Sequence, residues 1–370
     1  MTDSCNIRSI TTSQRDPAST PRPRVHILGL GSIGTFAAHL VSQIPNGPSV
    51  TLLLHRRSLL DDYRQNGDRI LFESREGEHF SSSGYELETI HNDQWYPVSD
   101  ESWPDEPTTA TIANLIVCVK ATQTVSALRS LAHRLNSFSN ILFLQNGSGM
   151  IEEVNTQLFQ DPLTRPNYFI GVISHGVTLN APFSITHTGF SATAIGQVPR
   201  DNAPSNTAIP DSQSEYLLQA VPLSPTLNLT PYSYTDILQV QLEKLAVNAF
   251  CNPLCALNDA KNEFLFSIPG TRRAILTEIS NVVFALPELK DVPGLEERFS
   301  VDRLEETVNG IIAKTANTTC SMVGDLRAGR ETEIQFINGS WSRMGRQVGV
   351  ATPVNDELVE EITKRTRSVK

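Results

Sequence analysis

The sequence predicts an α/β domain built around a parallel sheet, followed by an all-α domain. Two observations predict the sheet. Residues 24–54 read as strand, glycine-rich turn, helix and strand, and two later apolar strands end in polar residues. The third observation is that residues 233–370 carry helical apolar spacing, punctuated by proline and glycine. A chain of 370 residues is long enough for two domains of this size.

Composition excludes several classes of partner. The formal net charge of −10 argues against binding to nucleic acid or to an anionic membrane, and no apolar run approaches the ~20 residues of a membrane span. The five cysteines lie mostly in apolar segments, which favours reduced core thiols and a cytoplasmic protein. Cys251 and Cys255 lie one helical turn apart, but no further ligands accompany them at zinc spacing, so we expect no metal site.

The first 23 residues are rich in Ser, Thr, Arg and Pro and contain no apolar segment. This composition predicts a disordered tail, 1–23, and no secretory signal. A mitochondrial presequence is the alternative interpretation. It is disfavoured by Asp3 and Asp16, because such presequences are poor in acidic residues.

A glycine-rich turn follows the apolar strand 24–28 and opens a helix, and its residues are Gly29, Leu30, Gly31, Ser32, Ile33 and Gly34. In this context each glycine has a purpose. Gly29 permits a tight turn, Gly31 lets the backbone approach a pyrophosphate, and Gly34 lets the helix pack against the strand. The free amides of the helix N-terminus would bind the phosphates. The turn predicts a Rossmann-type dinucleotide site; a turn without a ligand is the alternative.

The end of the second strand, 50–54, indicates which nicotinamide cofactor binds. An NAD site places an acidic residue there for the ribose 2′-hydroxyl, but this chain continues with His55, Arg56 and Arg57 and has no acid before Asp61. Arginine suits a 2′-phosphate, because its hydrogen bonds to phosphate are charge-assisted and often bidentate. We therefore predict NADP(H), with Arg56 as the primary contact and Arg57 as a second candidate. Surface arginines without a ligand are the alternative.

Two more buried strands, 114–119 and 140–144, end in Lys120 and in Gln145-Asn146-Gly147. Ligands of open α/β sheets bind beyond the carboxyl ends of the strands. Lys120 and Asn146 are therefore candidates for cofactor or substrate binding, although Lys120 could equally be a solvated strand end. Residues 168–196 predict two or three further strands that complete the same sheet.

Residues 197–232 are rich in Pro, Ser, Asn and Asp and predict a loop-rich insert or linker, interrupted by a helix or strand at 215–221. This segment is the best domain boundary. It separates a predicted NADP-binding domain, 24–196, from a helical substrate-binding domain, 233–370. The helices expected in the second domain are 234–251, about 253–266, 270–286, 301–320, 331–348 and 355–368.

Three polar residues interrupt the otherwise apolar helix that begins at 234. Lys244, Asn248 and Asn252 are spaced i, i+4, i+8 and so lie on one face. Burying such groups without partners costs a few kcal/mol each. They therefore either satisfy one another in the core or line a cleft that holds a polar ligand. We favour the cleft, because the spacing is regular and one member is a titratable amine.

Two further polar segments lie in the helical half, at 321–326 and 331–334. Glu331 and Glu333 are acids near the start of a predicted helix, where negative charge stabilises the helix end. On this evidence a functional role for Glu333 is the less favoured interpretation.

Five short motifs occur in an order that resembles the ketopantoate reductase family, the NADPH-dependent 2-dehydropantoate 2-reductases. They are GLGSIG at 29–34, VKATQT at 119–124, LQNGSG at 144–149, KLAVNAFCNPLCAL at 244–257 and SMVGDLRAGRETEIQFING at 321–339. The resemblance spans residues 24 to about 360. It implies a Rossmann-type domain joined to an all-helical domain, with the active site in the interdomain cleft.

The resemblance also implies roles for single residues. Lys244 matches the family's catalytic lysine, and Glu333 matches an acidic residue near the reacting groups. Asn146 and Lys120 match positions at the junction of nicotinamide and substrate. The positions that match substrate-binding residues are Asn248, Asn252, Asn262 and Ser321. The chain departs from the family at Cys320, where many members have serine, and in its long insert and tail.

The activity implied is reduction of ketopantoate to pantoate, a step of pantothenate and coenzyme A biosynthesis, with Lys244 as general acid and NADPH as cofactor. Two alternatives stay open: a reductase of another 2-keto acid with the same architecture, and a non-catalytic NADP-binding regulatory homologue. Loss of Lys244 or of the glycine turn would mark the latter, and both are present. We expect a small 2-keto acid as the partner; a homodimer is left open.

Overall fold

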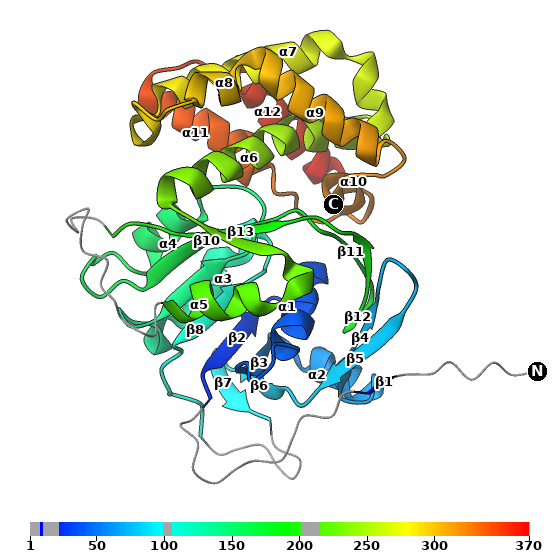
Figure 1. The fold of residues 1–370 in the computed structure, drawn as a ribbon, viewed down its shortest axis with the longest axis vertical. Helices are drawn as coiled ribbons and strands as arrows, with labels where there is room; N and C mark the ends of the chain where they lie inside the picture. The colour runs from blue at the N-terminus through cyan, green and yellow to red at the C-terminus, as the bar shows by residue number, and fades with distance from the viewer. Residues whose placement is uncertain (1–7, 10–21, 99–105, 201–214, 370) are drawn as a thin grey trace, which may run out of the picture. The chain divides into compact units, whose positions relative to one another are not determined.

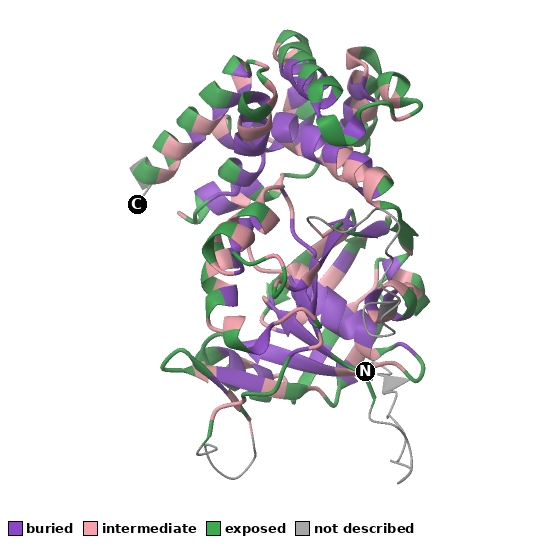
Figure 2. Ribbon diagram, turned by 90° about the vertical axis from the view of Figure 1, so that its left-hand side faces the viewer, coloured by how far each residue is buried: buried purple, intermediate pink, exposed green. Residues whose placement is uncertain are grey.

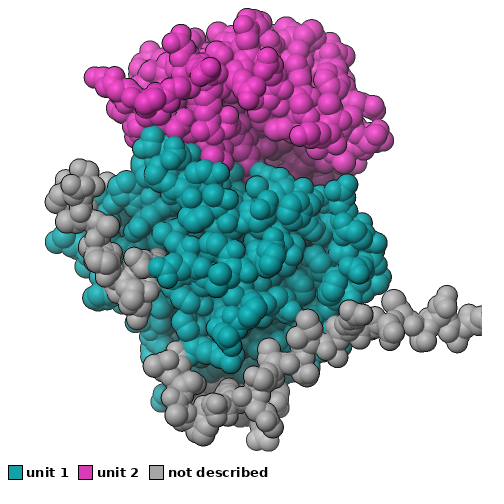
Figure 3. All heavy atoms as spheres, viewed as in Figure 1, with its two compact units in different colours: residues 1–145, 153–237 teal, residues 146–152, 238–370 magenta. Residues whose placement is uncertain are grey.

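The structure is a computed structural model that describes residues 8–9, 22–98, 106–200 and 215–369. It divides into two compact units (Figures 1 and 3). Unit 1 consists of residues 1–145 and 153–237, and unit 2 of residues 146–152 and 238–370. Nearly all of the predicted tail, 1–23, and part of the predicted insert, 201–214, lie outside the described residues.

Unit 1 contains a nine-stranded sheet with a parallel centre. Its strands, in spatial order, are β14 (Leu229–Tyr232), β13 (Thr193–Gln197), β10 (Asn167–Ile173), β9 (Asn140–Phe143), β8 (Asn114–Val117), β2 (Arg24–Leu28), β3 (Ser49–Leu54), β6 (Glu86–His91) and β7 (Gln94–Pro97). The pairings from β10 to β6 are all parallel. The chain order reverses between β2 and β8, which is the topological switch point of a Rossmann-type sheet. The predicted α/β class is confirmed.

Helices cover this sheet, and both faces of its central strands are buried (Figure 2). The helices are α1 (Ser32–Ser42), α2 (Arg57–Gln65), α3 (Thr124–Arg129), α4 (Met150–Gln157) and α5 (Glu215–Ala220), with short 3-10 turns η1 (Ala121–Gln123), η2 (Ala132–Arg134), η3 (Val221–Leu223) and η4 (Pro225–Leu227). Phe36 and Val41 of α1 are fully buried in the core. The apolar spacing that predicted α1 therefore marks its packed face.

A second sheet in unit 1 was not predicted. It has five strands in the order β1 (Arg8–Ser9), β5 (His79–Ser83), β4 (Arg69–Glu73), β12 (Ser184–Gly189) and β11 (Gly176–Ala181). The prediction that 168–196 completes one sheet is therefore wrong for β11 and β12. Ile185 of β12 is buried in the same core as Phe72 of β4 and Phe36 of α1. Burial against α1, which local strand periodicity does not encode, directs this hairpin to the second sheet.

The prediction of a loop-rich linker at 197–232 is wrong in part: the helix or strand expected at 215–221 is confirmed as α5, but the rest of the second half is also folded into unit 1. Residues 215–232 form α5, two 3-10 turns and β14, and β14 pairs in parallel with β13. Leu217, Val221 and Leu227 are buried in the core of unit 1, which anchors this segment despite its polar composition. The division between the units falls later, between Ile237 and Leu238.

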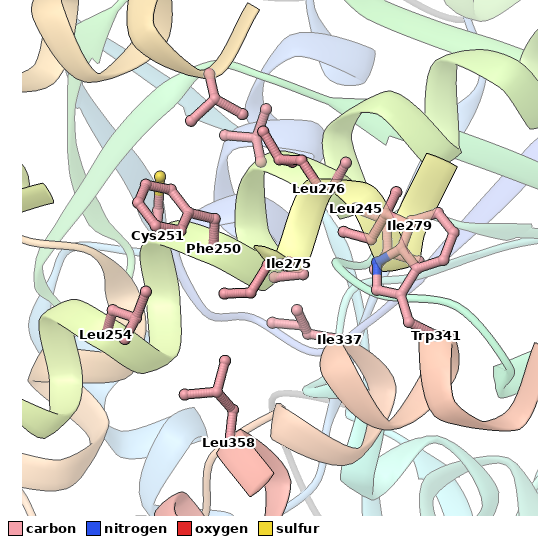
Figure 4. Packing of buried hydrophobic residues seen from close by; sticks show 14 of the residues in the cluster. Leu245, Phe250, Cys251, Leu254, Ile275, Leu276, Ile279, Ile337, Trp341 and Leu358 are labelled. Atoms are coloured by element: carbon pink, nitrogen blue, oxygen red, sulfur yellow. The ribbon is translucent and has the colours of Figure 1, made fainter. Parts of the chain in front are cut away.

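Unit 2 is all-α apart from the loop at its start, as predicted. Its helices are α6 (Tyr234–Leu257, from Leu238 on), α7 (Pro269–Ala285), α8 (Leu295–Phe299), α9 (Val301–Thr315), α10 (Ser321–Arg327), α11 (Asn338–Val348) and α12 (Pro353–Val369), with 3-10 turns η5 (Asn262–Ser267), η6 (Pro287–Leu289) and η7 (Ile334–Phe336). Phe250 of α6, Ile279 of α7 and Trp341 of α11 are fully buried in one cluster (Figure 4). No helix among the described residues combines the length and apolar character needed to cross a membrane.

Several predicted helix ends in unit 2 are wrong. Helix α6 does not break before Pro253 but continues to Leu257. A proline removes one backbone hydrogen bond, and the buried side chains of Cys251 and Cys255 on either side keep the last turns packed. The helix predicted from 331 begins only at Asn338, after the turn η7, and the one predicted to reach 320 ends at Thr315.

Candidate active site

Lys244 and Asn146, two residues that the sequence analysis singled out separately, are in direct contact. Lys244 Nζ donates a 2.8 Å hydrogen bond to Asn146 Oδ1. Asn146 opens the short segment 146–152, which belongs to unit 2 together with α6. Leu245 and Ala246 beside Lys244 are buried in the helical core, so the lysine backbone is held rigidly. The structure thus brings two predicted site residues, 98 positions apart, into one hydrogen bond.

The surroundings of Lys244 make its amine unusually acidic. Burial disfavours the charged ammonium and lowers the pKa of Lys244 from 10.5 to about 8, while the nearby negative charge of Glu333 acts in the opposite direction. Glu333 itself is buried and lies just before η7. Its carboxylate therefore acts on Lys244 rather than capping a helix, because no cap hydrogen bond forms there. An amine with a pKa near 8 can both hold and release a proton close to neutral pH.

Asn248 and Asn252 lie on the same face of α6 as Lys244. Asn248 is half-buried and Asn252 is buried. The backbone carbonyl of Asn252 accepts a hydrogen bond from Cys320 Sγ at 3.5 Å. Cys320 immediately precedes Ser321, the exposed first residue of α10. The start of α10 is therefore bonded to the backbone of α6 at Asn252, through Cys320. A joint contact of Ser321 and the two asparagines with substrate stays a prediction.

Asn262 differs from the other predicted substrate-binding residues. Its side-chain amide donates to Thr315 Oγ1 at 2.9 Å and accepts from Cys255 Sγ at 3.6 Å. Its backbone amide donates to the carbonyl of Thr318 at 3.0 Å. These bonds attach the start of η5 to the end of α9, which accounts for the burial of Asn262 by structure alone. Its substrate contact stays a prediction.

The glycine turn of unit 1 is closely packed at two of its glycines and open at the third. Gly29 has φ +95°, and a Cβ there would lie 2.5 Å from the backbone nitrogen of Val119. A Cβ on Gly34 would collide with the carbonyl oxygen of Gly29. Gly31, by contrast, has no atom within 4 Å of its Cβ position, and no side chain caps the first turn of α1. The turn thus offers open space and helix amides, and these residues fit a pyrophosphate.

The arginines after β3 are exposed, and one of them is held in place. Arg56 Nε donates to Ser58 Oγ at 3.0 Å, and its Nη1 lies 3.2 Å from His55 Nε2. Burial and the charge of Arg56 lower the pKa of His55, which disfavours the charged form of that ring beside the guanidinium. Arg57 begins α2 and is also exposed. The exposed guanidinium of Arg56 is suitable for a phosphate contact.

The strand ends of β8 and β9 are tied together by a residue that the sequence reasoning passed over. Gln145 Nε2 donates to the carbonyl of Val119 at 2.7 Å and to Thr124 Oγ1 at 2.8 Å. Lys120, half-buried, lies between these two partners and precedes η1. Lys120 belongs to unit 1, whereas Asn146 belongs to unit 2.

Comparison with known proteins identifies the family. A model described as "Ketopantoate reductase PanE/ApbA" matches residues 25–200, and its partner model, "Ketopantoate reductase PanE/ApbA C terminal", matches residues 236–366. The chain belongs to the ketopantoate reductase family. It is an oxidoreductase of that family.

Curated relatives of the family cover most of the chain. The probable 2-dehydropantoate 2-reductase of Schizosaccharomyces pombe is 29% identical, covering 90% of this chain and 94% of the relative. The 2-dehydropantoate 2-reductase of Vibrio cholerae is 31% identical, covering 67% and 76%. The ketoisovalerate reductase BEA2 of Gibberella fujikuroi is 25% identical, covering 87% and 78%.

Solved structures share the fold. A D-mandelate dehydrogenase bound to NADH and anilino(oxo)acetate has a TM-score of 0.71 at 20% identity, covering 94% of this chain and 99% of the other. A ketopantoate reductase family protein from Ralstonia eutropha has a TM-score of 0.69 at 18% identity, with the same coverage. These likenesses confirm the two-part architecture that the sequence predicted.

Three further residues contact the loop that carries Asn146, and the motifs did not reveal them. Gln241 Nε2 donates to the carbonyl of Gly147 at 3.1 Å, and Ser340 Oγ and Arg343 Nη2 donate to the carbonyl of Ser148 at 2.6 and 3.2 Å. Gln241 could have been found, because it lies one turn before Lys244 on the same helix face. Nothing in the sequence pattern distinguishes Ser340 or Arg343.

Proposed function

We propose that the protein catalyses the NADPH-dependent reduction of 2-dehydropantoate (ketopantoate) to pantoate, a step of pantothenate and coenzyme A biosynthesis. The observation that carries the proposal is the position of Lys244. Its desolvated amine donates to Asn146 and interacts with the charge of Glu333, on a helix face that continues with polar residues. The relatives named 2-dehydropantoate 2-reductase support the choice of substrate.

The cofactor NADPH, when bound, supplies a hydride. In the proposal, the amides that open α1 bind its pyrophosphate, and Arg56 binds its 2′-phosphate, with Arg57 as a second contact. The structural neighbour D-mandelate dehydrogenase is described with NADH, so the choice of NADPH rests on Arg56 and on the absence of an acid at the end of β3. Lys120 and Asn146 are proposed as further cofactor-binding residues.

Lys244 is proposed as the general acid. Reduction of a ketone leaves negative charge on the carbonyl oxygen, and an ammonium group stabilises that charge and then transfers its proton. Asn146 and Glu333 orient the amine for this transfer. Ser321, Asn248 and Asn252 are proposed to hold the substrate carboxylate and hydroxyl, so that the ketone is presented in one orientation. Asn262 is proposed to join them, in addition to its bonds to Thr315 and Cys255.

A second 2-keto acid is a specific alternative, because one relative is a ketoisovalerate reductase. Ketoisovalerate shares the carboxylate, the ketone and the branched carbon beside it with ketopantoate, but it has a hydrogen atom where ketopantoate carries a hydroxymethyl group. A site that hydrogen-bonds this hydroxyl rejects the analogue, because polar groups of the site are then left unpaired. The asparagines of α6 are the residues that we expect to make this distinction.

Compartment and assembly belong to the proposal as well. We place the reaction in the cytoplasm, with a mitochondrial location as the alternative, because the four described cysteines are free thiols. A neighbouring structure, from Staphylococcus aureus, is described as a dimeric ketopantoate reductase. We propose a homodimer for this chain, and sedimentation of the purified protein tests it.

The decisive experiment measures NADPH oxidation by absorbance with a panel of 2-keto acids. We expect kcat/KM for ketopantoate to exceed that for ketoisovalerate by about 100-fold or more. The reverse order would assign the protein to another 2-keto acid. Absence of turnover with every acid, together with intact NADPH binding, would instead favour the non-catalytic homologue.

Replacement of Arg56 tests the cofactor proposal. Arg56→Ala is expected to raise the Kd for NADPH about 10- to 100-fold, because charge-assisted hydrogen bonds to the 2′-phosphate are lost, and to leave the Kd for NADH nearly unchanged. The Kd values are measured by quenching of protein fluorescence. Arg57→Ala is the matched control, with a smaller effect expected. Equal weakening of both cofactors would contradict a contact to the 2′-phosphate.

A further inference from the structure

The loop that carries Asn146 is held by the helical unit through its backbone. The amide of Ser148 donates to the carbonyl of Phe336 at 2.9 Å, and the carbonyl of Ser148 accepts from Ser340 Oγ and Arg343 Nη2 at 2.6 and 3.2 Å. Gln241 adds a bond to the carbonyl of Gly147. The loop is therefore bonded to α6, η7 and α11 of the same unit.

One guanidinium, that of Arg343, contacts two separate segments. Its Nη2 donates to Ser148 in the loop and to Ser340 Oγ at 2.8 Å. Nη1 of Arg343 donates to the carbonyl of Gln335 in η7 at 2.8 Å. The central guanidinium carbon, Cζ, lies 5.7 Å from the centre of the Phe336 ring. A planar fork with several donors can make these bonds simultaneously, whereas a single ammonium cannot.

The two segments bound by Arg343 carry the two partners of Lys244. Ser148 lies two residues after Asn146, which accepts the hydrogen bond from Lys244. Gln335 lies two residues after Glu333, whose charge acts on Lys244. A shift of either segment would therefore move one partner away from the amine.

Two glycines show how closely this arrangement is packed. A Cβ on Gly149, at φ +99°, would lie 2.5 Å from Arg343 Nη2. A Cβ on Gly147, at φ +95°, would lie 2.6 Å from the carbonyl oxygen of Phe336. Only glycine allows the loop to approach both the guanidinium and η7 this closely. The contact is thus specific to the loop conformation that places Asn146 on Lys244.

We propose that Arg343 is a positioning residue: by binding the loop at Ser148 and the turn at Gln335, it holds Asn146 and Glu333 in place around Lys244. The structural part of this proposal concerns the free protein. Its consequence for catalysis rests on the proposed function, in which Lys244 is the general acid.

The first test follows Lys244 without any substrate or cofactor. The rate at which an anhydride acetylates the Lys244 amine is measured by mass spectrometry from about pH 6 to about pH 10, which gives its pKa. In Arg343→Met we expect this pKa to fall, because the amine stays desolvated on α6 while its acceptor and its negative partner move away. An unchanged pKa, or a rise, would overturn the proposal.

Two variants control this test. Arg343→Lys keeps the charge and the aliphatic stem but cannot bridge both segments, so we expect the same fall. Recovery of the wild-type pKa in this variant would show that charge alone suffices and would overturn the bridging role. Arg346→Met removes an exposed arginine of the same helix, one that pairs with Asp356 at 3.4 Å, and should leave the Lys244 pKa unchanged.

The second test is kinetic. Arg343→Met is expected to lower kcat with ketopantoate about 100-fold while KM and the Kd for NADPH change less than about threefold, because a small misplacement of catalytic groups acts mainly on the chemical step. If KM rises about 100-fold instead, while kcat stays near the wild-type value, the proposal is overturned. If the wild-type protein does not turn over any 2-keto acid, the proposed function fails, and the acetylation experiment still decides the role of Arg343.

Discussion

Lys244→Ala is expected to lower kcat for 2-keto acid reduction about 10³- to 10⁴-fold and to leave the Kd for NADPH within about twofold of the wild-type value. The variant removes both the proton donor and the positive charge beside the carbonyl oxygen. The proposed cofactor contacts lie mainly on the glycine turn and Arg56, which the substitution does not touch. Steady-state kinetics and a fluorescence titration measure the two quantities. Lys290→Ala, at an exposed lysine of the same unit, is the matched control.

The pH dependence of wild-type turnover gives an independent check on Lys244. Burial lowers the pKa of Lys244 from 10.5 to about 8, so the amine is protonated below that pH and neutral above it. Reduction needs the protonated form. We therefore expect kcat/KM, which reports ionisation of the free enzyme, to be constant below about pH 8 and to fall about tenfold per pH unit above it. Oxidation of pantoate needs the neutral amine and should rise over the same range. A turnover that does not respond to pH near 8, or an Ala variant with wild-type kcat, would refute the assignment.

Arg134→Met is expected to reduce the free energy of unfolding by about 3–5 kcal/mol, the largest loss of stability that we predict. Arg134 is only 2% exposed. Its Nη1 and Nη2 donate to the two carboxylate oxygens of Glu88 at 2.6 and 3.1 Å, and its Nε donates to the carbonyl of Ala110 at 2.9 Å. The pair attaches β6, near one edge of the nine-stranded sheet, to η2. Removing the arginine leaves a buried carboxylate without its partner.

Two controls separate this ion pair from general damage in urea unfolding. The double variant Arg134→Met/Glu88→Gln also removes the unpaired negative charge of Glu88. It should therefore recover part of the lost free energy of unfolding. Arg273→Met removes an exposed arginine that pairs with Asp302 and Glu305, and it should cost less than about 1 kcal/mol. If the double variant is no more stable than Arg134→Met, the unpaired charge of Glu88 is not the cause of the stability loss.

The stability from Glu88 also has a predicted pH dependence. Burial alone would raise the pKa of Glu88, but His26, with Nε2 3.7 Å from the carboxylate, and Arg134 outweigh it and lower the pKa to about 2. A lowered carboxyl pKa contributes stability that is fully present above the ordinary value of 4.5 and is lost as pH falls toward about 2. Arg134→Met should therefore reduce this acid-dependent part of the unfolding free energy and leave only the share that His26 supplies.

Local sequence patterns predicted most elements that position the site. The glycine turn predicted the β2–α1 junction, because tight backbone approach admits only glycine at Gly29 and Gly34. Apolar runs predicted the central strands, and helical spacing predicted that unit 2 is all-α. The regular spacing of Lys244, Asn248 and Asn252 identified the polar face of α6. These features are encoded within a few turns of chain, so they can be read from the sequence.

Features that depend on distant contacts were predicted poorly. The hairpin of β11 and β12 pairs with β4 in a separate sheet, since its register depends on burial against α1. The segment 215–232 reads as a linker but is held by buried leucines in the core of unit 1. Helix α6 continues past Pro253 for the same reason. Packing by residues far along the chain outweighs local propensity at each of these places.

The sequence by itself determined the family, the glycine turn and the presence of an amine on an apolar helix. Only the tertiary structure decided that Asn146, which follows β9, accepts a hydrogen bond from Lys244. It also decided that Arg343 bonds the two segments on which Asn146 and Glu333 lie. The pKa of Lys244 belongs to the same category. It depends on desolvation and on neighbouring charges, and both are set by atoms that come together only when the chain folds.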